Sequence, residues 1–141
     1  MNKTLLSLSS FLILVIYSSG FTQESTMAKS SGFYFDTQNL GTVTELDLDY
    51  KDINTFPSEI FEIKNLQSLD LSNNYLTEVP KEIKNLQELK VLKLNGNNIY
   101  ELPFEISRLK FLREIYLDYS IWFFRLNELK ALTNARIILI E

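Results

Sequence analysis

The stretch LQSLDLSNNYLTEVPKEIKNL, residues 66–86, decides the fold, because its pattern returns as LKVLKLNGNNIYELPFEISRL at residues 89–109, 23 positions later. The leucine, asparagine and proline positions of the two stretches coincide. The same shift extends the pattern back to 43–65 and forward to 112–134, and it leaves a half unit at 135–141. A period this strict indicates a solenoid, in which each unit packs against its neighbours.

Each unit predicts the same local structure. In L-x-x-L-x-L the side chains alternate between two faces, so Leu69 and Leu71 point inward from a short strand while Asp70 faces solvent. Asn74, and its repeat Asn97, stand where the chain leaves the strand, and their side chains are expected to satisfy backbone groups in the turn. The prolines Pro57, Pro80 and Pro103 recur in phase and fit the first position of a helical segment.

The two quoted stretches resemble leucine-rich repeats of the L-x-x-L-x-L-x-x-N-x-L-x-x-L-P-x-x-I-x-x-L type. The resemblance covers residues 43–134 well and 135–141 partly. Within this family, the repeats most resemble those of short secreted repeat proteins of spirochaetes and Bacteroidetes. It implies an α/β solenoid: a right-handed arc with a parallel β-sheet on its concave face and helical or 3-10 segments on its convex face. It also implies protein–protein interaction and no enzymatic role.

The predicted organisation places a signal peptide before the repeats. Lys3 precedes an apolar run from Leu5 to Tyr17, and the small residues up to Gly20 suit cleavage after that glycine. The run is shorter than the roughly 20 residues that a membrane-spanning helix requires, and a retained membrane anchor is the alternative. We therefore expect an extracytoplasmic protein (periplasmic, surface-bound or secreted). The predicted segments are a signal peptide at 1–20, an N-terminal linker and cap at 21–42, four repeats at 43–65, 66–88, 89–111 and 112–134, and a capping strand at 135–141.

Composition excludes several classes of function. The chain has no Cys and no His, which rules out disulfide scaffolds, Cys/His zinc sites and catalytic triads that contain His. Its formal net charge of −4 disfavours binding to nucleic acid, which requires a basic surface. We expect no cofactor, no metal, and no stable membrane insertion after signal cleavage.

The solvent-facing residues of the strands form columns across the predicted sheet, and this face mixes acidic side chains with tyrosines. Asp47 and Asp70 are neighbours of like charge in one column, a destabilising arrangement that Lys93 in the same column partly relieves. The candidate binding residues on this concave face are Asp47, Asp49, Tyr50, Asp70, Asn73, Lys93, Asn95, Tyr116, Asp118 and Tyr119.

Three hypotheses follow for this face. The first is an exported module that binds a protein partner, with tyrosines as anchors and acids that select a basic patch. The second is a structural or vestigial repeat fragment without a partner of its own, in which this face is a solvated sheet face whose charges serve solubility. The third, more distant, is a metal or hydrolase site built on Asp47, Asp49 and Asp70, although paired carboxylates need a pocket to perturb their pKa values.

The end of the chain departs from the pattern. The fourth unit has Ser120 in place of the asparagine and Leu126 in place of the proline, and Trp122, Phe123 and Phe124 are expected to fill a cap. Continuing the 23-residue shift puts Ile138 and Ile140 in the core, with Ile137 and Leu139 facing outward. An apolar edge strand of this kind is a template for pairing. Either Trp122, Phe123 and Phe124 with the preceding helix shield it, or a second molecule pairs with it; we expect a monomer with weak self-association.

Overall fold

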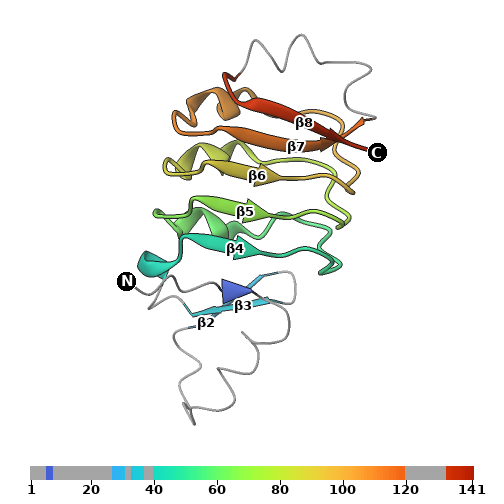
Figure 1. Cartoon of the computed structure of the whole chain (residues 1–141). Helices are drawn as coiled ribbons and strands as arrows, with labels where there is room; N and C mark the ends of the chain where they lie inside the picture. The colour runs from blue at the N-terminus through green and yellow to red at the C-terminus, as the bar shows by residue number, and fades with distance from the viewer. Residues whose placement is uncertain (1–5, 8–26, 31–32, 37–39, 120–132) are drawn as a thin grey trace.

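The computed structural model describes residues 6–7, 27–30, 33–36, 40–119 and 133–141 (Figure 1). The elements in chain order are β1 (Leu6–Ser7), β2 (Met27–Ser30), β3 (Phe33–Asp36), η2 (Leu40–Thr42), β4 (Glu45–Asp47), η3 (Ser58–Glu62), β5 (Ser68–Asp70), η4 (Lys81–Asn85), β6 (Val91–Lys93), η5 (Phe104–Arg108), β7 (Glu114–Asp118) and β8 (Arg136–Ile140), where η denotes a 3-10 helix. The predicted cap residues Trp122, Phe123 and Phe124 and most of the predicted signal peptide lie outside the described residues.

One parallel sheet organises the repeats. Its strands lie side by side in the order β1-β4-β5-β6-β7-β8, and the 3-10 helices lie behind them (Figure 1). From β4 to β7 the register advances by one repeat per strand, because Leu46 pairs with Leu69, Leu69 with Leu92, and Leu92 with Ile115. This confirms the predicted solenoid of stacked units with a parallel sheet.

The core lies between the sheet and the 3-10 helices. Leu69 and Leu92 are fully buried from the strand side, and Ile83 and Ile106 are buried from the helix side. No single unit could bury these side chains alone, so the apolar core is continuous from one unit to the next.

The prolines stand one residue earlier than predicted. Pro57, Pro80 and Pro103 occupy the N-cap position, with extended backbone, and the five-residue helices η3, η4 and η5 begin at the next residue. Each proline carbonyl accepts the first 3-10 hydrogen bond, from the amide of the isoleucine three residues later. The proline therefore ends the extended segment at a fixed φ, and the 3-10 turn follows.

The predicted asparagine ladder is confirmed. The Oδ1 atom of Asn74 accepts hydrogen bonds from the amides of Lys51 and Ile53, both at 3.0 Å. Its Nδ2 atom lies 2.8 Å from the carbonyl oxygen of Leu48, in the preceding unit, and 3.0 Å from that of Leu71. The side chain thus ties two successive turns together and supplies partners for backbone groups that are cut off from water.

Asn97 repeats this arrangement one unit later. Its Oδ1 atom accepts from the amide of Leu76 at 2.9 Å, and its Nδ2 atom donates to the carbonyl oxygens of Leu71 and Leu94 at 2.8 and 2.9 Å. No buried polar side-chain atom among the described residues lacks a hydrogen-bond partner.

The predicted register of the C-terminal strand is wrong by one residue. β8 pairs with β7 so that Glu114 faces Arg136, Ile115 faces Ile137 and Leu117 faces Leu139. The step is 22 residues rather than 23, and a slip of one residue exchanges the two faces of a strand. Ile137 and Leu139 therefore pack against the core, while Ile138 lies on the other face.

Candidate protein-binding face

The candidate residues lie on the strands or directly after them. We call the outer face the side chains of β4 to β8, and of the residues that follow these strands, that point away from the core. Strand pairing aligns them in rows across the sheet. One row contains Asp47, Asp70, Lys93, Tyr116 and Ile138, and the row beside it contains Glu45, Ser68, Val91, Glu114 and Arg136. The corrected register of β8 brings Ile138 and Arg136 into these rows in place of Leu139 and Ile137.

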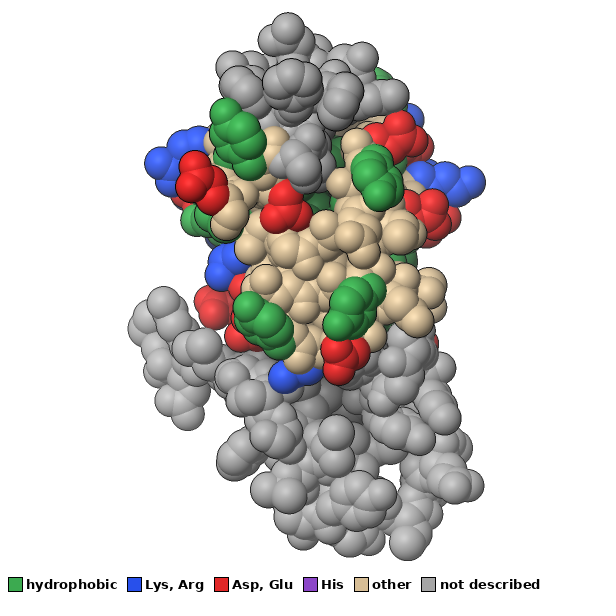
Figure 2. Space-filling model, turned by 90° about the vertical axis from the view of Figure 1, so that its right-hand side faces the viewer, with side chains coloured by type: hydrophobic (Ala, Val, Ile, Leu, Met, Phe, Trp, Pro, Cys, Tyr) green, Lys and Arg blue, Asp and Glu red, His purple; other side chains and the backbone are tan. Residues whose placement is uncertain are grey.

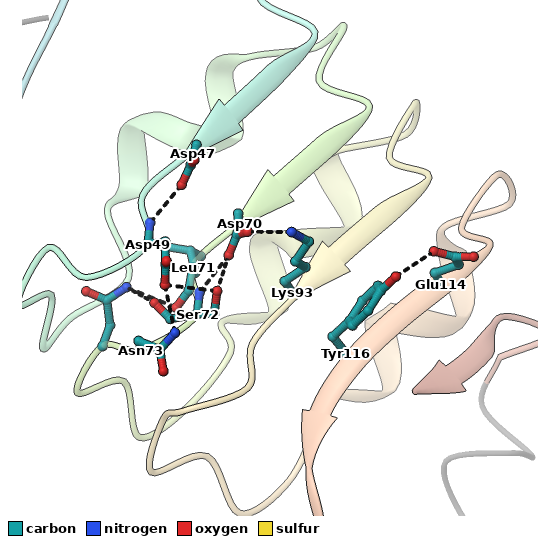
Figure 3. A network of polar contacts seen from close by, with 10 residues as sticks. Asp47, Asp49, Asp70, Leu71, Ser72, Asn73, Lys93, Glu114 and Tyr116 are labelled. Atoms are coloured by element: carbon teal, nitrogen blue, oxygen red, sulfur yellow. Dashed lines mark hydrogen bonds and ion pairs between the residues drawn. The ribbon is translucent and has the colours of Figure 1, made fainter. Parts of the chain in front are cut away.

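Lys93 compensates the two aspartates in its row, as the sequence suggested. Asp47 and Asp70 are register partners on adjacent strands, and the Nζ atom of Lys93 lies 2.7 Å from Oδ2 of Asp70 (Figure 3). The hydrogen bond to Asp70 raises the pKa of Lys93, against the opposing effect of burial, and the charge of Asp47 adds to the increase. The lysine also lies 5.9 Å from the ring centroid of Tyr116.

A polar network at the ends of β4 and β5 organises Asp49 and Asn73. Oδ1 of Asp49 accepts hydrogen bonds from Oγ of Ser72 at 3.1 Å and from Nδ2 of Asn73 at 2.9 Å (Figure 3). The same hydroxyl contacts Oδ1 of Asp70, so its single proton lies between two carboxylates. Ser72 is buried by these neighbours although its position in the repeat faces solvent, and the sequence pattern does not reveal that.

A second group of charges connects β7 to β8. Glu114 accepts a hydrogen bond from the hydroxyl of Tyr116 at 3.0 Å and forms an ion pair with Arg136. The hydrogen bond with Arg136, and then that with Tyr116, lowers the pKa of Glu114. The bond to Glu114 raises the pKa of Tyr116. The pairing of Glu114 with Arg136 did not follow from the sequence, because the predicted register placed Ile137 beside the glutamate.

Asp118 has a structural role in the described residues. Its carboxylate accepts hydrogen bonds from the amide of Gly96, at 2.8 Å, and from the amide of Asn97, at 3.2 Å. The Asn97 amide is one of those that the next ladder asparagine would bind, and the fourth unit has Ser120 at that position. The Gly96 amide is equivalent to those of Tyr50 and Asn73, which donate to backbone carbonyls. The backbone carbonyl of Asn95 accepts a hydrogen bond from the amide of Asn73.

The residues that follow the strands share a left-handed backbone. Tyr50, Asn73 and Gly96 occupy equivalent positions, with φ values of 52°, 53° and 72°. Glycine and asparagine adopt this region readily, whereas a bulky residue there is an outlier. The Tyr50 side chain is nevertheless 73% exposed and that of Tyr119 is 50% exposed. Figure 2 shows the side of the molecule where the chain leaves the strands; hydrophobic side chains stand apart from one another there, with carboxylates near them.

Two other properties bear on the function. In the part of the chain that the structure describes, no group of three or more acidic side chains is placed to hold a metal ion. Over the same residues, no helix has the length and apolar character needed to cross a membrane.

Comparisons with known proteins agree with the repeat architecture. A family model described as a leucine-rich repeat region matches residues 58–140. A leucine-rich repeat protein from Leptospira interrogans has a similar solved structure, with 36% sequence identity over 72% of this chain and a TM-score of 0.66. This chain covers 26% of the length of that protein. No curated protein matches the sequence.

A second solved structure shares the fold alone. Internalin C2 from Listeria monocytogenes aligns with 79% of this chain at a TM-score of 0.58, with 23% sequence identity. The alignment covers 47% of the internalin chain.

Proposed function

This chain belongs to the leucine-rich repeat family, and from that premise we propose that it is an exported module that binds a protein partner through the outer face. Stacked repeats of a solenoid form an extended, regular surface that is suited to binding. The proposed partner surface is basic, because the outer face carries unbalanced negative charge at one end.

The charge distribution supports placing the contact over the first two units. There the rows of the outer face set Glu45, Asp47 and Asp70 against a single cation, Lys93, which is committed to Asp70. In the later units Glu114 is paired with Arg136, and the carboxylate of Asp118 is engaged by backbone amides. Lysine or arginine side chains of a partner would therefore gain most over β4 and β5.

Tyr50 is the observation that carries the proposal. A tyrosine in the left-handed region costs on the order of 1–3 kcal/mol, and strain of this kind concentrates at binding sites. The exposed ring returns little packing energy to the fold in compensation. Tyrosine is a common anchor in protein interfaces, and Tyr50 stands close in sequence to Asp49 and Asp52.

The test is affinity capture from extracts of the producing cell, with bound proteins identified by mass spectrometry. The variant combines Asp47→Asn, Asp49→Asn and Tyr50→Ala. The matched control is Tyr100→Ala, which removes an equally exposed tyrosine that lies outside the rows of the outer face. We expect wild type and control to capture the same protein and the triple variant to lose it, with binding that weakens as salt is raised.

Two outcomes would count against this function. If the triple variant folds and still captures the protein, the outer face is not the contact surface. If wild type captures no protein specifically, the alternative of a structural or vestigial repeat fragment is favoured. The more distant metal or hydrolase hypothesis gains no support, because among the described residues Asp47, Asp49 and Asp70 are not grouped so as to hold a metal ion.

A further inference from the structure

We propose that the outer edge of β8 pairs with β8 of a second copy of this chain, in antiparallel orientation. β8 is the last strand in the sheet order and is hydrogen-bonded to β7. Among the described residues, no strand pairs with its other edge. An edge with free backbone groups and apolar side chains is a template for strand addition.

The backbone pattern defines which groups the second copy would meet. The amide of Arg136 donates to the carbonyl of Arg113, toward β7. Backbone groups alternate in direction along a strand, so those of Ile138 and Ile140 also point to β7. The amide and carbonyl groups of Ile137 and Leu139 therefore point away from the sheet, toward the open edge.

The side chains of β8 are poorly covered on the core side. Ile137 and Leu139 pack against the core but are only partly buried, whereas their partners Ile115 and Leu117 in β7 are fully buried. On the opposite face Ile140 is 37% exposed. Apart from Arg136, both faces of the strand are thus apolar and incompletely covered, and one more strand with two apolar faces would cover both.

A second β8 satisfies these requirements over the whole strand. In the antiparallel register centred on Ile138, Ile137 exchanges both backbone hydrogen bonds with Leu139 of the second copy, and Ile138 faces its own counterpart. Arg136 then lies opposite Ile140 of the second copy, so no like charges meet. The sheets and cores of the two copies become continuous, which identifies a second copy as the occupant.

The association is expected to be weak. The pairing involves only the five residues of β8 in each copy. The area that it buries should be smaller than that of a stable interface, which is roughly 1,200–2,000 Å² in total. The dimer should therefore appear as concentration increases. The test is sedimentation velocity of the full chain over a concentration series.

The variants follow from the corrected register. Ile138→Lys places two ammonium groups face to face on the two-fold axis, and we expect it to stay monomeric where wild type dimerises. Ile140→Glu is the matched control, because it puts a carboxylate opposite Arg136 of the second copy and should retain or strengthen the dimer. Leu139→Lys would be ambiguous, because Leu139 packs against the core.

A charge exchange completes the experiment. Ile138→Glu alone should be monomeric, and an equimolar mixture of Ile138→Glu and Ile138→Lys should recover the dimer. Far-UV circular dichroism verifies that each variant is folded. A wild type that remains monomeric throughout, an Ile138→Lys variant that associates like wild type, or a mixture that fails to associate would each overturn the proposal.

Discussion

Single asparagines hold successive turns of this solenoid together. Asn97 connects its own turn to the preceding unit through hydrogen bonds to Leu71 and Leu76. Replacing it with alanine leaves those backbone groups without a partner, which costs about 1–3 kcal/mol for a buried group. We expect Asn97→Ala to lower the free energy of unfolding by that amount in urea denaturation.

Asn98→Ala is the control for the ladder, because Asn98 is exposed and its backbone bond to Leu76 is unaffected. It should unfold close to wild type. Equal stability of the two variants would show that the ladder bonds do not contribute.

Gly96 is required by its conformation and by its neighbour. Its φ of 72° disfavours a side chain, and a Cβ atom there would collide with Oδ1 of Asn73 and lie 2.9 Å from its Cα. Gly96→Ala should therefore cost about 1–3 kcal/mol of stability. Gly41→Ala is the matched control, since a Cβ atom at that position would have nothing within 4 Å. Thermal melting of both variants tests this, and an unchanged Gly96→Ala would contradict the steric argument.

At the scale of elements, one ion pair connects β7 to β8 and should make their contact sensitive to pH. The pKa of Glu114 in the folded protein is below its ordinary value of 4.5. The stabilisation that ionised Glu114 gives the folded protein is therefore fully present above its ordinary pKa, and it is lost as the pH falls through the lowered pKa. The melting temperature of wild type should exceed that of Glu114→Gln at neutral pH, and the difference should disappear on acidification.

Glu78→Gln provides the comparison for this experiment, because Glu78 is exposed and has no described ion pair. Its melting temperature should follow that of wild type at every pH. A constant difference between wild type and Glu114→Gln down to low pH would contradict the assignment.

The elements differ in how far the sequence predicts them. The strands β4 to β7, their buried leucines and the ladder asparagines follow from the period, because each position recurs with the same chemistry. β8 could not be placed in the same way. The fourth unit lacks the asparagine and the proline that mark its length, and ARIILIE is apolar at both alternating sets of positions. The hydrophobic pattern therefore does not distinguish one face from the other.

The candidate site was predictable in outline and not in detail. Asp47, Asp70 and Lys93 occupy the same position in successive repeats. The sequence therefore places them in one row, because a parallel register aligns equivalent positions on neighbouring strands. The pairing of Glu114 with Arg136 depends on the register of β8 and was missed. The burial of Ser72 results from side-chain conformations of its neighbours, which periodicity does not encode.

At the scale of the whole molecule, stability depends on contacts between neighbouring units. Leu92 is fully buried in β6, with a repeat on each side. Leu92→Ala should cost about 2–5 kcal/mol. In a short array that loss should shift the entire unfolding transition rather than one part of it. Denaturation followed by circular dichroism measures the shift, and Val91→Ala, in the same strand but on the outer face, should be much milder.

Export is the remaining prediction, and it concerns the first strand. β1 lies within the predicted signal peptide and pairs with β4. Cleavage after Gly20 would remove β1 and give a mature chain that starts at Phe21. Intact-mass measurement of the protein recovered outside the cytoplasm tests this, and a mature form that still carries Met1 would reject the signal peptide.

The unequal steps of the register have a consequence for how such a gene can change. Across β4 to β7 each step is the same 23 residues, so an in-frame duplication or deletion of one such unit's codons preserves the pairing of the strands on either side. The step into β8 is one residue shorter. A recombination event that aligned this junction by the 23-residue period would shift the following strand by one residue and exchange its two faces. Insertions and deletions of whole repeats are therefore tolerated most easily among the central units.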